Sequence, residues 1–283
     1  MNLKTGMISA ITSFCRPGWR ARAVAGFFSG GLKIFRPRGG EARENLKSVY
    51  PEATDVWIRR TVNGVYEHLS WMVAECLALQ RDPRLSLEWM KAVEGKEILD
   101  SIKAAGRGAI ILTGHVGNWE LLAAWLAQSG YPLSAVVRSP DDADFSRIIA
   151  SFRSRTGVGV FEKHFVMKET IRFARNGGFL GLMPDQAWNS TGIPTEFLGR
   201  RCYTAGGPAA IARLAGVPVV PVASYRVAPF RHEVRISEPI KMVEGADKQR
   251  SIKENTDRMN RAIEKMILEH PEQWLWLHRR WRF

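Results

Sequence analysis

The sequence predicts a layered α/β fold, in which a sheet lies between layers of helices, together with a helical N-terminal region. From about residue 105, apolar stretches typical of strands alternate with amphipathic stretches typical of helices, and this rhythm is characteristic of such layers. Residues 1–90 are instead predicted to be mostly helical, because apolar residues recur three and four positions apart over 55–79. A chain of 283 residues can bury a full core within one large domain, with or without a small appendage.

The alternating part of the chain begins with a strand at 109–114 and a helix at 118–130, where Gly130 is a favourable residue for ending a helix. The remaining predicted elements are a strand at 133–138, a helix at 142–157, a strand at 158–161, a helix at 166–178, a strand at 179–184, a loop to residue 206, a helix at 207–216, strands at 217–227 and 233–240, and a helix at 248–270. We therefore expect a helical, basic region over 1–90 and an α/β domain over 91–283.

The chain is strongly basic, with 41 Lys and Arg against 28 Asp and Glu and a net charge of +13. Such a surplus favours polyanionic partners: nucleic acid, anionic lipid or an acidic carrier protein. Nucleic acid is disfavoured, since the sequence has no zinc-finger spacing, no RRM-like aromatic signature and no basic repeat. The cysteines, Cys15, Cys76 and Cys202, are odd in number and far apart, so we expect no disulfide framework and no metal site.

The N-terminal region has features of a segment that lies on a membrane surface. We predict neither a spanning helix nor a signal peptide there, because no uncharged apolar run approaches the roughly 18–20 residues that a span needs and no cleavage site follows. The first 48 residues mix nine Lys and Arg with bulky apolar side chains, among them Trp19, Phe27, Ile34 and Phe35. This mixture suits insertion among anionic headgroups, and a solvated basic arm is the alternative.

Candidate catalytic residues lie in the stretch GHVGNWE, between the predicted strand and helix. His115 and Glu120 are five positions apart, which a regular helix rotates by about 140°, so they can meet only if His115 lies in the turn before the helix. Gly114 and Gly117 permit that turn, and Asn118 is a plausible helix cap that would put Glu120 in the first turn. We expect Glu120 to fix the imidazole tautomer, making His115 a general base; a merely capping histidine is the alternative.

Motifs of other chemistries are missing: the sequence has no G-x-S-x-G, no H-E-x-x-H, no Walker loop and no complete G-x-G-x-x-G. A general base without a nucleophilic side chain on the protein favours direct transfer, in which the hydroxyl of the acceptor attacks.

Several blocks in order carry a family resemblance: GHVGNWELL, VVRSPDDADF, FRSRTG, LMPDQ, the long block from IPTEFLGRR to GVPVVPV, and HPEQWLWLHRRWR. Over roughly residues 40–283 the chain resembles the bacterial lipid A biosynthesis acyltransferases, which add lauroyl or myristoyl chains and are related to the glycerolipid acyltransferases. The resemblance implies a glycerolipid-acyltransferase-like core and transfer of a fatty acyl group from a thioester carrier to a lipid hydroxyl. His115 and Glu120 match the family's His-x4-acid pair.

The resemblance also implies substrate-binding residues. Arg138, Arg153 and Arg155 match arginines near the family's site, where a guanidinium could bind a lipid phosphate or an oxyanion; solvated helix arginines are the alternative. Asp185 matches an acidic position that could orient an arginine or the acceptor, or simply cap a turn. The segment with Thr204, Gly206 and Gly207 could offer backbone amides to an anion or form a plain turn. Phe197 and Leu198 could line an acyl groove or belong to the core.

The expected activity is therefore O-acyl transfer from acyl carrier protein or coenzyme A to a membrane glycolipid hydroxyl, with a lipid A precursor as the leading acceptor and no cofactor. The short, basic N-terminus differs from the long apolar anchor common in the family, which keeps other glycolipids or phospholipids open as acceptors. A non-catalytic lipid-binding protein and a thioester hydrolase are the rival functions. The expected location is the cytoplasmic face of the bacterial inner membrane, peripheral or monotopic, and the tail WLWLHRRWRF is expected to combine packing with headgroup contact.

Overall fold

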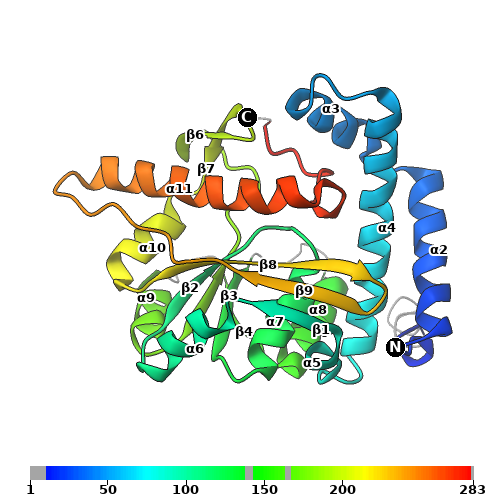
Figure 1. Cartoon of the computed structure of the whole chain (residues 1–283), viewed down its shortest axis with the longest axis horizontal. Coiled ribbons are helices and arrows are strands. Elements are labelled where there is room, and N and C mark those ends of the chain that lie inside the picture. The colour runs from blue at the N-terminus through cyan, green and yellow to red at the C-terminus, as the bar shows by residue number, and fades with distance from the viewer. Residues whose placement is uncertain (1–10, 138–142, 163–166, 282–283) are drawn as a thin grey trace.

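The computed structural model of the chain describes residues 11–137, 143–162 and 167–281. In these ranges a seven-stranded sheet lies between layers of helices (Figure 1), which confirms the predicted α/β class. The strands are β1 (Met90–Glu94), β2 (Ala109–Leu112), β3 (Leu133–Val137), β4 (Gly159–Glu162), β5 (Phe179–Leu182), β8 (Val219–Ala228) and β9 (Arg231–Ile236). Their order across the sheet is β1-β9-β8-β2-β5-β3-β4, and every neighbouring pair is parallel except β8 and β9.

The pairing of β2 with β5 positions the candidate site. Leu112 pairs with Leu182 in a parallel register, so the two strands end side by side. Residues that leave β2 after Leu112 and residues that leave β5 after Leu182 therefore emerge at the same edge of the sheet, where α/β folds place their ligands.

Helices cover both faces of the sheet, as the alternation of side chains along β2 demonstrates. Ile110 and Leu112 pack into a core with residues of α10 and α11, whereas Ala109 and Ile111 pack with residues of α5, α6 and α7. The helices are α2 (Trp19–Phe35), α3 (Gly39–Val49), α4 (Asp55–Leu79), α5 (Leu85–Trp89), α6 (Lys96–Ala104), α7 (Trp119–Gln128), α8 (Ala143–Thr156), α9 (Met167–Arg175), α10 (Gly207–Ala215) and α11 (Lys248–Glu269).

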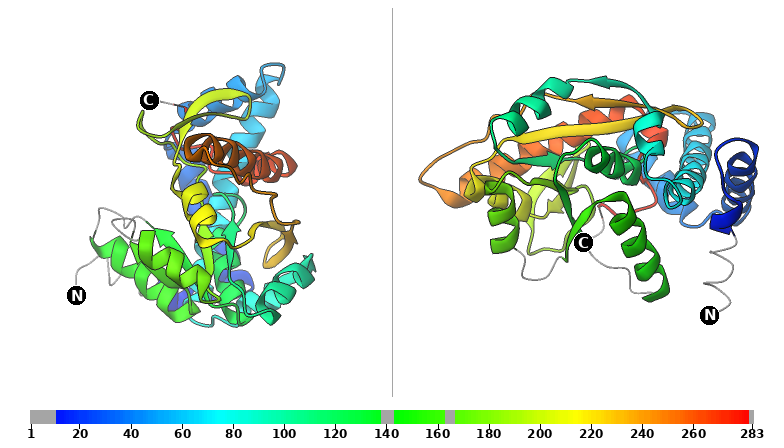
Figure 2. Two further views of the ribbon diagram at one scale, coloured as in Figure 1. Left: turned by 90° about the vertical axis from the view of Figure 1, so that its left-hand side faces the viewer. Right: turned by 90° about the horizontal axis from the view of Figure 1, so that it is seen from below.

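The N-terminal helices form one side of the molecule. Helix α2 packs along α4, which in turn contacts α7, and α2 is the outermost of these elements (Figures 1 and 2). The α4 helix begins where Thr54 Oγ1 accepts a hydrogen bond from Trp57 N. Helix α2 buries Ala21, Val24 and Ala25 but leaves Phe27 and Phe35 78% and 84% exposed. Among the described helices, none combines the length and apolar character that crossing a bilayer requires.

A hairpin replaces part of the loop predicted before residue 206. Strands β6 (Ile193–Phe197) and β7 (Arg200–Thr204) pair antiparallel, from Ile193 with Thr204 to Phe197 with Arg200. Burial alternates along β6, where Thr195 and Phe197 point inward and Pro194 and Glu196 are exposed. Proline and charged residues hid this pattern, but an isolated two-stranded ribbon has free edges that tolerate both. Strand β1 and helix α6 were also not predicted.

The aromatic tail after α11 is packed inside the protein. Following a short 3₁₀ turn at Pro271–Gln273, Trp274, Trp276 and Trp281 are all buried, and their rings contact one another. The predicted packing of these tryptophans is therefore confirmed, whereas their predicted headgroup contact is wrong, because burial leaves their rings little free surface. Arg279 is exposed and pairs with Glu41, while Arg282 and Phe283 lie outside the described residues.

Candidate active site

The centre of the candidate site is a hydrogen-bonded pair, His115 and Asp185. His115 follows β2 and Asp185 follows β5, and the imidazole Nδ1 lies 2.9 Å from Asp185 Oδ1. The other oxygen, Oδ2, accepts bonds from His115 N at 2.8 Å and from the Trp274 indole Nε1 at 2.9 Å. Asp185 is only 1% exposed, whereas the His115 side chain is 19% exposed. A buried carboxylate thus holds a histidine that is accessible from outside.

The electrostatics of this pair favour an ionised carboxylate. Burial raises the pKa of Asp185, but the positive charge that His115 has when protonated and the hydrogen bonds from His115 and Trp274 outweigh burial and lower it to about 2. Because an ionised carboxylate only accepts hydrogen bonds, Nδ1 of His115 carries a proton; because an amide NH₂ only donates, the contact from Gln186 requires a lone pair on Nε2. Gln186 Nε2 lies 3.1 Å from this nitrogen and donates to it.

The glycines and Asn118 build the turn that presents His115. Gly117 has a φ of +58°, and a Cβ there would lie 1.5 Å from Ser224 O in β8. A Cβ at Gly114 would lie 3.3 Å from the Asp185 carboxyl group. Asn118 Oδ1 accepts a hydrogen bond from Leu121 N, which confirms the predicted cap and puts Glu120 in the first turn of α7.

Glu120 does not hold the imidazole, so the expectation that it orients His115 is wrong. Both ring nitrogens of His115 are bonded to other residues, and Glu120 pairs with Arg153 of α8. Arg153 Nη2 lies 2.6 Å from Glu120 Oε1 and Nε lies 3.3 Å from Oε2, a two-pronged geometry. The cause is positional: α7 turns Glu120 toward α8, while Asp185 reaches His115 from the adjacent strand. The two side chains of the pair are 16% and 17% exposed.

A buried ionic network supports the His115 turn from behind. Glu75 of α4 is fully buried and accepts bonds from Arg226 Nη2 at 2.6 Å, from His232 Nε2 at 3.0 Å and from Asn118 Nδ2 at 2.8 Å. His68, also on α4, donates from Nε2 to Gly117 O at 3.0 Å and accepts from Arg226 Nη1. The helix side of the turn, at Gly117 and Asn118, is thereby fixed to α4 and through Arg226 to β8.

The other predicted substrate-binding residues have diverse surroundings. Arg138 lies outside the described residues. Arg155 is exposed on α8 and donates to Gln80 O. Gly206 is half-buried against Ile193, where a Cβ would lie 2.9 Å from the isoleucine side chain. Gly207 begins α10.

Burial decides between the alternatives left open for the 197–204 segment. Thr204 is fully buried at the end of β7, so neither its backbone amide nor its hydroxyl, which bonds Thr195, Asn260 and Arg280, is accessible to an anion from outside. Phe197 is fully buried against Trp274 and Trp281 and belongs to the core rather than to an acyl groove. The neighbouring Leu198 is 9% exposed and lies in the same core cluster.

Sequence reasoning did not assign three residues around the pair, Gln186, Trp274 and His278, to the site. Ala187 N points to His278 Nδ1 at 3.5 Å, and burial lowers the pKa of His278. Gln186 and His278 belong to blocks that the sequence did distinguish, LMPDQ and WLWLHRRW. Had the pairing of β2 with β5 been known, it would have predicted that Asp185 and Gln186 lie beside His115.

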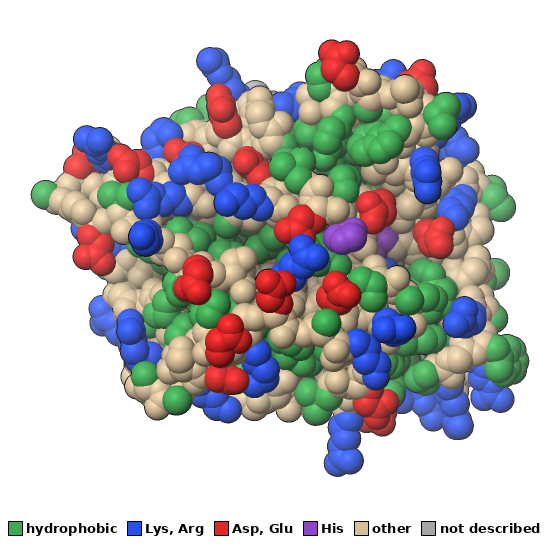
Figure 3. Space-filling model, in the orientation of Figure 1, with side chains coloured by type: hydrophobic (Ala, Val, Ile, Leu, Met, Phe, Trp, Pro, Cys, Tyr) green, Lys and Arg blue, Asp and Glu red, His purple; other side chains and the backbone are tan. Residues whose placement is uncertain are grey.

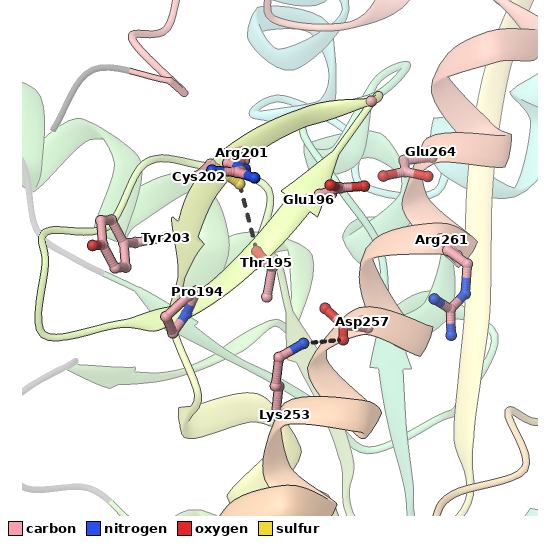
Figure 4. A pocket seen from close by; sticks show the side chains of 11 residues that line it. Pro194, Thr195, Glu196, Arg201, Cys202, Tyr203, Lys253, Asp257, Arg261 and Glu264 are labelled. Atoms are coloured by element: carbon pink, nitrogen blue, oxygen red, sulfur yellow. Dashed lines mark hydrogen bonds and ion pairs between the residues drawn. The ribbon is translucent and has the colours of Figure 1, made fainter.

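A separate groove opens between the β6–β7 hairpin and α11 (Figure 4). It encloses about 650 Å³, and neither His115 nor Asp185 lines it. Charged side chains dominate its wall: Arg201, Lys253, Arg261, Glu196, Asp257 and Glu264.

Comparisons with known proteins identify the family of the chain. The family model described as "Bacterial lipid A biosynthesis acyltransferase" matches residues 20–283. The chain is 26% identical to a phosphatidylinositol mannoside acyltransferase of Mycobacterium tuberculosis, over 72% of this chain and 69% of that protein. It is also 24% identical to the lipid A biosynthesis lauroyltransferase of Escherichia coli, over 89% and 81% of the two chains, and 22% identical to the palmitoleoyltransferase of the same organism, over 95% and 84%. The chain therefore belongs to the bacterial lipid A biosynthesis acyltransferase family and is an acyltransferase.

Proposed function

We propose that the protein transfers a fatty acyl group from a thioester, carried by acyl carrier protein or coenzyme A, to a hydroxyl of a membrane glycolipid. The observation that carries the proposal is the pair of His115 and Asp185, in which Nδ1 is held by a buried carboxylate and Nε2 has a lone pair. This is the arrangement of a general base that removes a proton from a hydroxyl. No cofactor is required, because the thioester already carries an activated acyl group.

The reaction proceeds by direct attack. The acceptor hydroxyl displaces Gln186 from Nε2 of His115 and gives its proton to that nitrogen as its oxygen attacks the thioester carbonyl. Asp185 stabilises the imidazolium that forms. The tetrahedral intermediate then collapses, the carbon–sulfur bond breaks, and the imidazolium returns the proton to the leaving thiolate. An ester and a free thiol result, and His115 is neutral again.

Arg153 is the positive group proposed to act on the substrates. Glu120 holds its guanidinium in place through two contacts and leaves it partly exposed at the first turn of α7, the helix that follows His115 in the chain. From there it is suited to bind a lipid phosphate or to stabilise the negative charge on the thioester oxygen in the intermediate. Glu120 then acts on Arg153, rather than on the base.

A lipid A precursor is the leading acceptor, in keeping with the family match and with the names of the Escherichia coli relatives. A mannosylated phosphatidylinositol is the second candidate, favoured by the mycobacterial relatives. Both are anionic glycolipids with sugar hydroxyls, so the same base and the same guanidinium suit either acceptor.

We further propose that α2 rests on an anionic membrane, at the cytoplasmic face of the inner membrane. Trp19, Phe27, Ile34 and Phe35 are between 68% and 84% exposed. Lys and Arg side chains lie beside hydrophobic ones near the edge where α2 runs (Figure 3). Apolar side chains inserted among headgroups and cations bound to lipid phosphates reinforce each other.

The net charge of +13 also favours docking of an acidic carrier protein.

The decisive experiment is a reconstituted assay with purified protein, acyl carrier protein or coenzyme A loaded with a labelled acyl chain, and vesicles. The vesicles contain a lipid A precursor, a mannosylated phosphatidylinositol or neither, and mass spectrometry identifies the products. A glycolipid heavier by one acyl unit, lost with His115→Gln, is the expected result. Free fatty acid formed equally without acceptor would indicate a hydrolase. Vesicle binding without turnover would indicate a lipid-binding protein and contradict the proposal.

A further inference from the structure

Three hydrogen-bond donors converge on the carboxylate of Asp185. His115 supplies two of them, and the third is the indole Nε1 of Trp274, 2.9 Å from Oδ2. Asp185 and Trp274 are 1% and 2% exposed, so water has no access from which to replace the indole. The tail that contains Trp274 thus contributes a polar group to the candidate site.

The backbone around Trp274 is bound directly to the turn that carries His115. Leu275 N donates to His115 O at 3.1 Å, and Gly117 N donates to Gln273 O at 2.9 Å. Between these bonds, Val116 and Trp274 form an antiparallel β-bridge. The segment that carries the indole and the segment that carries the imidazole are therefore hydrogen-bonded to each other and cannot move independently.

The same segment is fixed to the sheet on its other side. Gln273 Oε1 accepts from Arg226 N at 2.9 Å, and Gln273 Nε2 donates to Arg226 O at 3.0 Å. The side-chain amide thus satisfies both backbone groups of one residue in β8. These two hydrogen bonds fix the position of Gln273 relative to β8, and they thereby restrain the indole of the next residue, Trp274.

We infer that Trp274 is a positioning residue for the His115–Asp185 pair, an inference that rests on the proposed function. A carboxylate can rotate about its Cβ–Cγ bond, and the indole bond to Oδ2 sets the rotation at which Oδ1 meets His115 Nδ1. Indole is a donor only and does not titrate, so it takes no proton from the pair. It also shares the carboxylate charge, which moderates the pull of Asp185 on the imidazole proton.

The test compares Trp274→Phe with Trp276→Phe. Trp276 is equally buried in the same tail, but its indole Nε1 donates to Pro271 O at 2.7 Å, away from the carboxylate. Each substitution removes one indole donor and keeps an aromatic ring. Only the first removes a bond to Asp185, so Trp276→Phe controls for any general loosening of the tail.

With Trp274→Phe we expect kcat per folded molecule to fall by about tenfold or more, with KM for both substrates within about twofold, because a hydrogen bond to a charged group is lost. The acidic limb of the pH–rate profile should move to higher pH by about half a unit, since a carboxylate with one donor fewer holds the imidazolium proton more tightly. Trp276→Phe should leave the profile in place. Equal losses in both variants, or an unmoved limb in Trp274→Phe, would overturn the inference.

A measurement without substrate separates this inference from the proposed function. In ¹⁵N-indole spectra the Trp274 resonance is assigned by its absence from Trp274→Phe. Asp185→Ala should move that resonance upfield and leave the Trp276 resonance in place; Asp185→Asn serves as a second variant if the alanine protein does not fold. If the chemical shift of the Trp274 resonance is the same in both Asp185 variants as in the wild-type protein, the inference fails, whether or not the protein transfers acyl groups. If it responds but the wild-type protein transfers no acyl group, the proposed function fails instead.

Discussion

Glu120 forms its ion pair with Arg153 and leaves His115 to Asp185, a residue 70 positions further along the chain. Two partly exposed functional groups, a base and a guanidinium, are thus each held by a separate carboxylate. Because each group has its own carboxylate, the charge environment of His115 is independent of that of Arg153. It also means that changes to the two carboxylates should have different effects.

The first prediction concerns the Glu120–Arg153 pair. Glu120→Gln and Arg153→Gln should each lower kcat/KM, and the double variant should lose less than the sum of the two, with a coupling energy of about 0.5–3 kcal/mol. The reason is that Glu120 acts through Arg153. A parallel cycle on the exposed Lys253–Asp257 pair of α11 should have no effect on turnover. Fully additive losses at Glu120 and Arg153 would count against the assignment.

The second prediction concerns the base. His115→Gln and Asp185→Asn should each lower kcat by about 10²–10⁴-fold, the usual contribution of general-base catalysis. Because both residues serve one proton transfer, the double variant should be no slower than His115→Gln alone. Steady-state kinetics with saturating donor and acceptor provide the comparison. If Asp185→Asn keeps full turnover, the pair is not the base.

The third prediction concerns Gln186, which donates to His115 Nε2 in the protein without substrate. An incoming hydroxyl has to replace this contact, so Gln186→Ala should raise kcat/KM for the acceptor by about two- to tenfold, the worth of one ordinary hydrogen bond. Varying the acceptor at saturating donor measures the effect. A loss as large as that of His115→Gln would instead make Gln186 part of the catalytic machinery.

The fourth prediction concerns α2 and the membrane. The double variant Phe27→Ser/Phe35→Ser should bind anionic vesicles about tenfold or more weakly. Without the two phenyl rings, the protein loses the favourable free energy of moving them from water into the membrane interface. Leu268→Ser is the matched control, since Leu268 is 52% exposed on α11. Co-sedimentation at rising salt reports the electrostatic part separately. Equal binding by the wild-type protein, the double variant and Leu268→Ser would contradict the proposal that α2 contacts the membrane.

The fifth prediction concerns stability and pH. Burial and the positive charge of Arg226 both lower the pKa of His68 and of His232 below the ordinary value of 6.5. Below about pH 6.5 the unfolded chain therefore takes up protons that the folded protein excludes, and each histidine lowers the free energy of unfolding by up to about 1.4 kcal/mol per pH unit.

Urea unfolding between pH 8 and pH 5 checks this expectation. The wild-type protein should lose stability as the pH falls, and His68→Gln should show a shallower loss, even if it starts from a lower stability at pH 8. Parallel curves for the two proteins would contradict the assignment of the proton uptake to His68.

The sequence predicted the features that depend on local pattern. The alternation of strands and helices, the turn with Gly114 and Gly117, and the cap at Asn118 all follow from side-chain periodicity and backbone freedom over a few residues. The partner of His115 depends instead on which strands are neighbours. Glu120 was close in sequence and chemically suitable, but strand pairing brought Asp185 closer in space.

The tail illustrates the same limit. Tryptophans beside arginines suit a membrane interface as well as a protein interior, and composition alone cannot separate the two. The structure buries Trp274, Trp276 and Arg280, and Arg280 donates to Gln186 O, Tyr203 O and Thr204 Oγ1. These acceptors come from loops and strands distant in sequence, so the burial of an arginine there could not be anticipated from its neighbours.

The buried carboxylate of Glu75 has a consequence for protein engineering. It joins α4, of the helical N-terminal region, to Asn118, Arg226 and His232 of the α/β part. A chimera that exchanges the helical region between relatives would leave those donors facing a foreign side chain, with charges stranded in the interior. Grafts intended to retarget the enzyme to a different bilayer should therefore exchange α2 alone, or carry all four members of this cluster together.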